Sequence, residues 1–449
     1  MECKGVAICL SMNVKSSNRF RWAFCQLEVL RHCFPSSVRH ILEELPESLD
    51  DTYERILREI RKPNQGHAHR LLQCLVAAVR PLRVKELAEV LAFDFSAEGT
   101  PKLNLGWRWD DKEEAVMSAC SSLVMIVKDG DSRIVQFSHF SVKEFLTANR
   151  LTDPIRDVSS YHIRLEAAHT ILAQACLGVL LRLDDHVDRD DIKNFPLARY
   201  AARYWPTHAQ FENASLRIKD GMECLFDSDK RHFATWLWIY DEDQNGLSMT
   251  TMSPKKPETA PLYYAAMFGF RDLAEHLVAN HPEHIDTRGS ERLTPMHVAA
   301  RAGHPGVLSL LLENGADVDV HNVHGTTPLY RASRSGKLEA GQFLLDRGAD
   351  INARGHMGET PLSGALFERR VEFARMLLTR GASIDTHGTD GNTPLHWAVV
   401  KENIEAVRLL LEHGADVNAR DDGGKTPSQY SGQPEIVELL SKYSTKSGE

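Results

Sequence analysis

The C-terminal half of the chain repeats itself with a constant period of 33 residues. A Thr-Pro pair recurs at this interval, beginning at Thr294, Thr327, Thr360, Thr393 and Thr426. A Gly-Ala pair recurs in the same register, beginning at Gly315, Gly348, Gly381 and Gly414. Two independent markers with one period indicate a structural unit that is stacked several times, because self-similarity of this length is typical of solenoid proteins.

Each marker predicts a piece of local structure. The proline suits the first position of a helix, where its missing N–H costs nothing, and the threonine before it is placed to cap that helix. Val407, Leu410 and Leu411 follow at helical spacing and predict a second helix. Gly414 supplies the left-handed residue that ends this helix. The repeat therefore predicts a helix, a turn, a second helix and a hairpin loop.

This pattern closely resembles the ankyrin repeat. The stretches 393–420 and 294–320 are near the consensus of that family, and we count six repeats. The first repeat, from Ala260, is degenerate, and the last, from Thr426, is shortened. Atypical end units are expected, because a terminal repeat faces water on one side.

Two positions within the repeats carry further expectations. In the ankyrin family a His in the Thr-Pro-x-His position hydrogen-bonds within the scaffold, and the resemblance implies this role for His297 and His396. The fourth repeat has Ser363 in place of that His, and Arg369 in place of the usual Gly between the two helices. We expect a weaker turn at that point.

The resemblance to ankyrin repeats implies a protein-binding module whose contacts lie on the hairpin tips and the exposed ends of the first helices, lining a concave face. On the tips the candidate contacts are Ser290, Glu291, Val323, His324, His356, Met357, Thr389, Asp390, Asp421 and Asp422. On the first helices they are Arg301, Arg334, Phe367, Glu368, Val400 and Lys401. Exposed apolar groups at Met357, Phe367 and Val400 would suit a protein interface.

The N-terminal half shows a different order of elements. Helices are predicted at about 45–60, 67–79, 83–91, 113–120 and 141–148. Between the last two, Leu123–Val127 and Ile134–Phe137 flank Asp129-Gly130, which is a strong hairpin signal. The three helices at 67–79, 83–91 and 113–120, followed by a two-stranded hairpin, predict a winged-helix module.

The N-terminal half also resembles a known arrangement. The segments LPESLDDTYERILREI and VQFSHFSVKEFL are similar to the region that follows the nucleotide-binding domain in fungal NACHT–ankyrin proteins. Those proteins are signal-transducing NTPases of the NOD-like type. Their winged helix shares its name with a GPI inositol-deacylase, and the shared name does not imply deacylase chemistry.

The two resemblances together define the expected architecture. The fold class is mainly α, with a winged-helix module and a helical linker followed by an ankyrin-repeat solenoid with β-hairpin loops. The expected domains are a helical lead-in at 1–45, which would be the remnant of a NACHT module, a winged-helix domain at 46–152, a helical linker domain at 153–245 and an ankyrin domain at 246–445.

A phosphate-binding loop is not found in the sequence. The Gly424-Lys425-Thr426 triplet lacks the required earlier glycine, because Ala419 stands there, and it lies in the ankyrin register. The NACHT resemblance nevertheless assigns Phe137, His139, Ser141 and Glu144 to a motif whose histidine reaches the phosphates of bound ADP. Without a phosphate-binding loop, the alternative is that His139 is a polar residue at a strand–helix junction.

Charge and cysteine content bound the remaining possibilities. The net charge of −9 and the acidic start of the third helix, Asp110 to Glu114, oppose binding to nucleic acid or to an anionic membrane. The sequence contains no Cys-x-x-Cys pair of the kind that binds a metal, so we expect the cysteines to be reduced thiols. It also shows no secretory signal, so we expect a cytoplasmic protein.

We therefore expect a non-enzymatic adaptor in signal transduction, with a protein partner and with no cofactor, metal or small-molecule substrate. The alternative is a fragment of a nucleotide-dependent NACHT ATPase or GTPase whose P-loop part is missing from this sequence.

Overall fold

The computed structural model describes residues 48–96, 99–152, 158–183, 187–245, 254, 257 and 259–444. The helical lead-in predicted at 1–45 lies outside these residues. The chain divides into two compact units, of which the first takes in Met1–Leu225 with Lys230–Lys255 and the second Phe226–Asp229 with Lys256–Glu449. The described part is mainly helical, as predicted.

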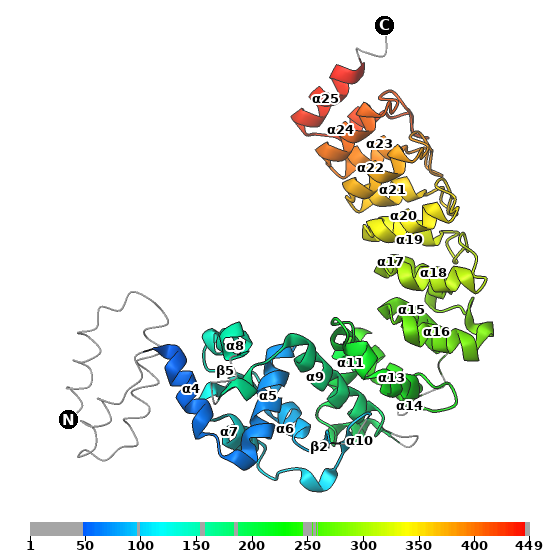
Figure 1. Cartoon of the computed structure of the whole chain (residues 1–449). Coiled ribbons are helices and arrows are strands. Elements are labelled where there is room, and N and C mark those ends of the chain that lie inside the picture. The colour runs from blue at the N-terminus through cyan, green and yellow to red at the C-terminus, as the bar shows by residue number, and fades with distance from the viewer. Residues whose placement is uncertain are drawn as a thin grey trace, which may run out of the picture. The chain divides into compact units, whose positions relative to one another are not determined.

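The first unit begins with the predicted winged helix (Figure 1). Its helices are α4 (Leu49–Glu59), α5 (Gln65–Ala77), α6 (Val84–Val90), α7 (Lys112–Cys120) and α8 (Phe140–Thr147), and its hairpin is β4 (Val124–Asp129) with β5 (Ser132–Phe137). Each of these elements falls where the sequence pattern placed one. The hairpin turns at Gly130, whose φ of 56° lies in the left-handed region.

Two short strand pairings were not predicted. Strand β1 (Leu82–Arg83) pairs antiparallel with β5, so the sheet has the order β1-β5-β4 and Leu82 lies opposite Val135. Strands β2 (Phe93–Asp94) and β3 (Lys102–Leu103) form a separate antiparallel pair. Strands of two residues are too short to show an alternating pattern, and Arg83 had been assigned to the following helix. The third strand completes the sheet of the winged helix.

A helical segment follows in the same unit. Its helices are α9 (Leu165–Leu180), α10 (Arg189–Lys193), α11 (Ala198–Ala209), α12 (Ala214–Arg217), α13 (Lys219–Leu225) and α14 (His232–Asn245). Short 3-10 turns precede and follow the winged-helix elements at Lys62–Asn64, Leu105–Trp107, Ser121–Leu123, Asn149–Thr152 and Ser159–Tyr161. Trp205 and Trp236 lie fully buried and edge to face in its core, with ring centroids 5.8 Å apart.

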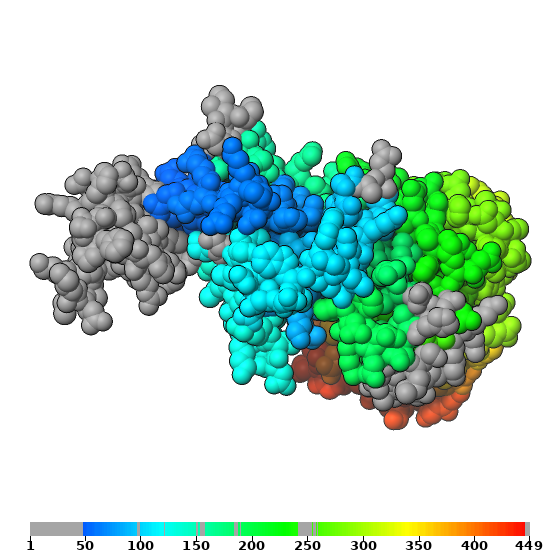
Figure 2. Space-filling view, turned by 90° about the horizontal axis from the view of Figure 1, so that it is seen from below, coloured from blue at the N-terminus to red at the C-terminus, as the bar shows by residue number. Residues whose placement is uncertain are grey.

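Buried charge joins the winged helix to this helical segment. Glu89 on α6 is 3% exposed and forms an ion pair with Arg108, and its carboxylate also accepts a 2.7 Å hydrogen bond from the backbone N–H of Leu197 at the start of α11. On the face drawn in Figure 2 the atoms of the two segments (blue to green) form one continuous surface. The domain boundaries proposed within this unit stay a prediction.

The second unit contains six helical pairs among the described residues. The first members are α15 (Pro261–Phe268), α17 (Pro295–Ala302), α19 (Pro328–Ser335), α21 (Pro361–Phe367), α23 (Pro394–Val400) and the 3-10 turn η8 (Pro427–Tyr430). The second members are α16 (Arg271–Asn280), α18 (Pro305–Glu313), α20 (Leu338–Asp346), α22 (Val371–Thr379), α24 (Ile404–Glu412) and α25 (Pro434–Ser444). Figure 1 shows the connecting loops along one side of this stack.

The predicted start and end signals of the ankyrin helices are confirmed. Each first member begins with its proline, and Gly414 has a φ of 89° after α24. In the second repeat the backbone N–H of Thr294 donates to His297 Nδ1, while His297 Nε2 lies 3.0 Å from the carbonyl oxygen of Thr326. Because a carbonyl can only accept, Nε2 carries the proton and Nδ1 is the acceptor. His396 makes the equivalent contacts with Thr393 and Lys425.

In the fourth repeat the turn between the two helices carries a non-glycine residue in the left-handed region of backbone space, and its expected weakness stays a prediction. Arg369 has a φ of 58°, where the first three repeats place Gly269, Gly303 and Gly336. A side chain in this region of backbone space costs about 1–2 kcal/mol. The fifth repeat has Glu402 at the same position with a φ of 50°, which the sequence analysis did not single out.

Candidate functional site

The hairpin tips of the ankyrin unit are joined from repeat to repeat by backbone hydrogen bonds. In four successive steps a tip N–H donates to the tip carbonyl of the preceding repeat, over 2.8–3.2 Å. The pairs are Val323 to Glu291, His356 to His324, Thr389 to Met357, and Asp422 to Asp390. Eight of the ten predicted tip contacts therefore belong to one hydrogen-bonded row, which fixes the spacing of the side chains along it.

Most of these tip side chains are exposed. Met357 has the highest exposure among the large apolar residues, at 71%, and Val323 is 40% exposed. Asp421 differs, because it is only 9% exposed and its carboxylate accepts hydrogen bonds from the Lys425 backbone N–H and the Tyr430 hydroxyl. Its side chain holds the last hairpin together and is not free to meet a partner.

Four of the six predicted residues on the first helices meet side by side across three repeats. Phe367, at the end of α21, lies beneath the Lys401 ammonium at 3.6 Å and beside the Arg334 guanidinium at 5.7 Å from its ring centre. Arg334 Nε also donates to Glu368 Oε1 over 3.1 Å, forming an ion pair. Four residues chosen from the repeat pattern thus form one contiguous group.

One member of this group was missed in the sequence. Trp397 on α23 packs edge to face against Phe367, with ring centroids 5.7 Å apart and an interplanar angle of 70°. The residue equivalent to Phe367 in the next repeat is Val400, and Trp397 lies one helical turn before it. Residues one turn apart share a face of the helix, so helical spacing could have identified Trp397. We call Arg334, Phe367, Glu368, Trp397 and Lys401 the aromatic cluster.

The chemistry of the aromatic cluster suits protein recognition. An aromatic pair and a cation over an aromatic face each contribute about 0.5–1.5 kcal/mol, so the cluster is held in place before a partner arrives. Phe367 and the neighbouring Val400 remain 39% and 44% exposed. Aromatic and arginine side chains that are rigid and still accessible are the residues that most often dominate binding energy at protein interfaces.

A second interaction between repeats lies nearer the start of the array. Arg331 on α19 forms a 2.7 Å ion pair with Glu291 at the tip of the preceding loop. Glu291 was a predicted contact, whereas Arg331 was not. Arg301, on the exposed end of α17, is exposed but does not belong to the aromatic cluster. The contacts among the predicted first-helix residues therefore extend over the third to fifth repeats.

The structure gives His139 a local role in the winged helix. It is the N-cap of α8, and its Nδ1 accepts from the backbone N–H of Ser141 over 3.3 Å and lies 2.6 Å from the Ser141 hydroxyl. Ser141 is buried and hydrogen-bonds Tyr53 over 2.9 Å. One ring nitrogen of His139 is thus occupied by the cap at the predicted strand–helix junction.

The third helix and wing do not form a basic surface. On α7, Glu113 forms an ion pair with Arg133 of β5, so one of the two cations of the wing is already paired. The wing turn also carries Asp129 and Asp131.

Within the described segments, no helix is both long and apolar enough to cross a membrane.

Comparisons with known proteins agree with this architecture. A family model of three ankyrin repeats matches residues 262–355 and 362–447, and a model of the GPI inositol-deacylase winged helix domain matches residues 53–155. Azaphilone pigments biosynthesis cluster protein L of Monascus ruber is 32% identical over 294 residues, which cover 62% of this chain and 61% of that protein. Alpha-latrocrustotoxin-Lt1a of Latrodectus tredecimguttatus is 42% identical over 59 residues, or 13% of this chain and 4% of the toxin.

The chain spans less than two thirds of the length of either relative. It contains a winged helix domain of the GPI inositol-deacylase type and, after it, ankyrin repeats, which generally mediate protein–protein interactions.

Proposed function

We propose that this protein is a non-enzymatic adaptor that recognises a protein partner through the hairpin tips and first helices of its ankyrin repeats. The observation that carries the proposal is the aromatic cluster, in which three consecutive repeats bring together an aromatic pair and two cations packed against the Phe367 ring. The hydrogen-bonded row of tips lies on the same repeats and keeps their spacing fixed. Such a platform binds without large rearrangement, which lowers the entropic cost of association.

We further propose that the winged helix and the helical segment act as a regulatory segment, as in the sensor half of a NOD-like receptor. In support, buried contacts tie the two together, since the Glu89 carboxylate bridges α6 and α11. A segment joined in this way transmits a displacement as one body. In this proposal the partner binds the repeats, and the N-terminal unit relays that event to an NTPase module in the same or another chain.

The recognition surface can be tested by a capture experiment with matched variants. The full chain is immobilised as wild type, as an Arg334→Ala/Met357→Ala/Phe367→Ala triple variant, and as a Glu339→Ala/Glu372→Ala/Glu405→Ala control. The control residues lie exposed on the second helices α20, α22 and α24. We expect proteins captured by wild type and control to be lost from the first variant. Equal capture by all three would refute the placement.

The alternative function is a nucleotide-dependent switch, for which this chain would be one part. The observation that favours it is that Phe137, His139 and Ser141 lie together at the β5–α8 junction of a winged helix. Binding of ADP to the purified chain, abolished by His139→Ala, would support the switch. If the wild-type chain does not bind ADP, or if His139→Ala binds it as tightly as wild type does, the adaptor is supported.

A further inference from the structure

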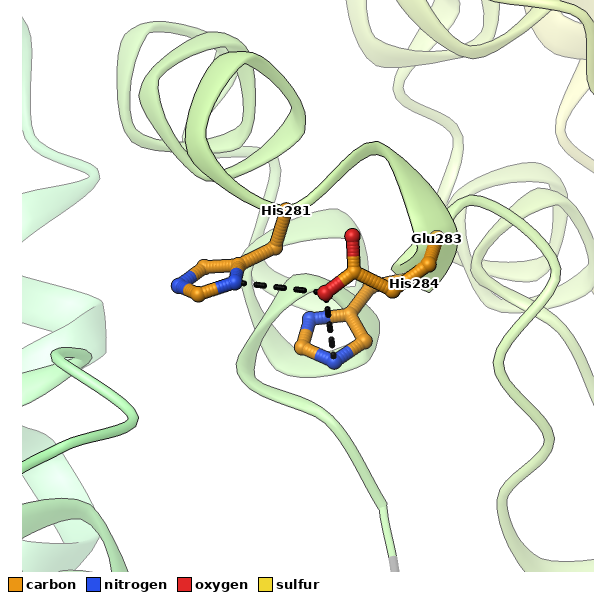
Figure 3. Close-up of side chains that lie close together, drawn as sticks. All are labelled: His281, Glu283 and His284. Carbon is orange, nitrogen blue, oxygen red and sulfur yellow. Dashed lines mark hydrogen bonds and ion pairs between the residues drawn. The ribbon is translucent and has the colours of Figure 1, made fainter.

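A group of possible metal ligands lies between the first and second ankyrin repeats. His281, Glu283 and His284 stand at the end of α16 and in the 3-10 turn η6 (Pro282–His284), and Figure 3 shows both imidazole rings facing the same carboxylate. This group is separate from the aromatic cluster. No cysteine motif had suggested a metal site, and in the degenerate first repeat these residues begin where the second repeat has the pair Gly315-Ala316.

The backbone of this turn places the two histidines on one side. A 3-10 helix has three residues per turn, so side chains at positions i and i+3 lie one above the other. Here the N–H of His284 donates to the carbonyl of His281 over 3.0 Å, which closes that turn, and Pro282 fixes its first backbone angle. The two imidazole rings are stacked, with centroids 5.1 Å apart and planes 27° apart.

The ligand atoms are close to the separation that a metal requires. His281 Nδ1 lies 3.4 Å and His284 Nε2 lies 3.9 Å from Glu283 Oε1, and all three atoms are within 4.8 Å of one another. With bonds of about 2.0–2.1 Å, tetrahedral Zn²⁺ places its ligand atoms about 3.3–3.4 Å apart. One distance already agrees, and rotation of partly exposed side chains can close the others.

A further contact orients His281 as a ligand. Its Nε2 lies 3.2 Å from the hydroxyl oxygen of Ser228, a residue of the same compact unit. When Nε2–H donates to that oxygen, Nδ1 presents its lone pair to the space shared with Glu283. Metal-binding histidines commonly hold their second nitrogen in such a hydrogen bond, which fixes the tautomer.

We propose that His281, Glu283 and His284 form a site for a divalent transition metal, with Zn²⁺ as the ion that fits best. Two imidazole nitrogens and one carboxylate oxygen are a donor set that Zn²⁺ accepts, and they leave a fourth position for water or for a group from a partner. The bound ion would fasten the turn that links the first repeat to the second.

The test is a metal titration of the full chain after treatment with EDTA. Zn²⁺ binding is followed by calorimetry, and Co²⁺ is used as a coloured probe of tetrahedral coordination. We expect one saturable site, whose affinity falls at least about 100-fold in His281→Ala and in His284→Ala, and about 10-fold in Ser228→Ala. Glu283→Gln keeps the size of the side chain but loses its charge, and this variant should also bind Zn²⁺ weakly.

The matched control is His387→Ala, which removes an exposed histidine from another loop of the same unit. This variant should bind Zn²⁺ as wild type does. Hydrogen exchange of residues 281–287 should slow when Zn²⁺ is added, which gives a measurement independent of the variants. An affinity unchanged in His281→Ala/His284→Ala, or exchange at 281–287 that Zn²⁺ does not alter, would overturn the proposal.

Discussion

The buried histidine of the second ankyrin repeat predicts a loss of stability as the solution becomes mildly acidic. His297 is 0% exposed, and burial lowers its pKa from 6.5 to about 4. In the folded repeat Nε2–H donates to Thr326 and Nδ1 accepts from Thr294, so the neutral ring is the form that fits. Protonation would add a hydrogen to His297 Nδ1, which could then no longer accept the hydrogen bond from the Thr294 N–H.

The direction and size of this pH-dependent change in stability follow from proton linkage. Between pH 6.5 and about 4 the unfolded chain binds a proton at this histidine and the folded chain does not, so acid favours unfolding. At pH 5 the gap below the unfolded pKa of 6.5 is about 1.5 units, and each unit is worth about 1.36 kcal/mol. We therefore expect His297 to lower the free energy of unfolding of its repeat by roughly 2 kcal/mol between pH 7 and pH 5.

The assay is native-state hydrogen exchange, followed by mass spectrometry on peptides covering α17 and α18. His304 in the same repeat also has a pKa lowered by burial, so the wild type alone does not isolate His297. His297→Gln provides the comparison, because Gln429 already makes the equivalent contact with the Thr426 N–H over 2.9 Å in the last repeat. The variant should start about 1 kcal/mol less stable at pH 7, from its lost hydrogen bond to Thr326.

The decisive quantity is the difference between the two pH dependences. Opening free energies of wild type should fall about 2 kcal/mol more than those of His297→Gln, and exposed His324→Gln should behave as wild type. Identical pH dependence in wild type and His297→Gln would refute the reasoning, since it would mean that burial does not keep this ring neutral.

Three further predictions concern stability. Arg369→Gly should raise the free energy of unfolding of the ankyrin unit by about 1 kcal/mol in urea titrations, because it relieves a φ of 58°, whereas Arg369→Ala should not. Gly341→Ala should lower the free energy of unfolding by about 1–3 kcal/mol, because the new methyl group would lie 2.3 Å from Phe373 Cζ. Gly306→Ala is the control and should not lower it, because its methyl group would lie 3.5 Å from the nearest atom. Glu89→Ala should destabilise the N-terminal unit by about 3 kcal/mol, measured by the fluorescence of buried Trp205, because Arg108 and the Leu197 N–H lose their partner.

Much of the architecture could be predicted because local chemistry and the repeat period agree. Proline at the first helical position and glycine with positive φ mark the ends of the ankyrin helices, and the two apolar runs that flank Asp129-Gly130 predicted the wing. The two-residue strand β1 could not be found in this way, because its pairing with β5 depends on contacts distant in sequence.

The candidate site was predictable in its position but not in its contacts. The period places Phe367 and Arg334 on one face, yet the meeting of Phe367 with Trp397 and Lys401 depends on how consecutive repeats pack. Conversely, the repeat register places Asp421 at a hairpin tip and predicts a contact there. Its carboxylate instead accepts a hydrogen bond from the Tyr430 hydroxyl within the same hairpin. The convergence of His281 and His284 on Glu283 depends on a 3-10 turn that interrupts the repeat pattern.

The most direct test of the recognition surface is the dissociation constant for a purified partner identified by capture. Arg334→Ala/Met357→Ala/Phe367→Ala removes one cation and two exposed apolar groups from this face, and interface residues of these kinds contribute about 1–2 kcal/mol or more each. We predict at least about a 100-fold weaker complex, with less than a twofold change for Glu339→Ala/Glu372→Ala/Glu405→Ala. An unchanged affinity in the first variant, or an equal loss in both, would contradict the proposed adaptor function of this face.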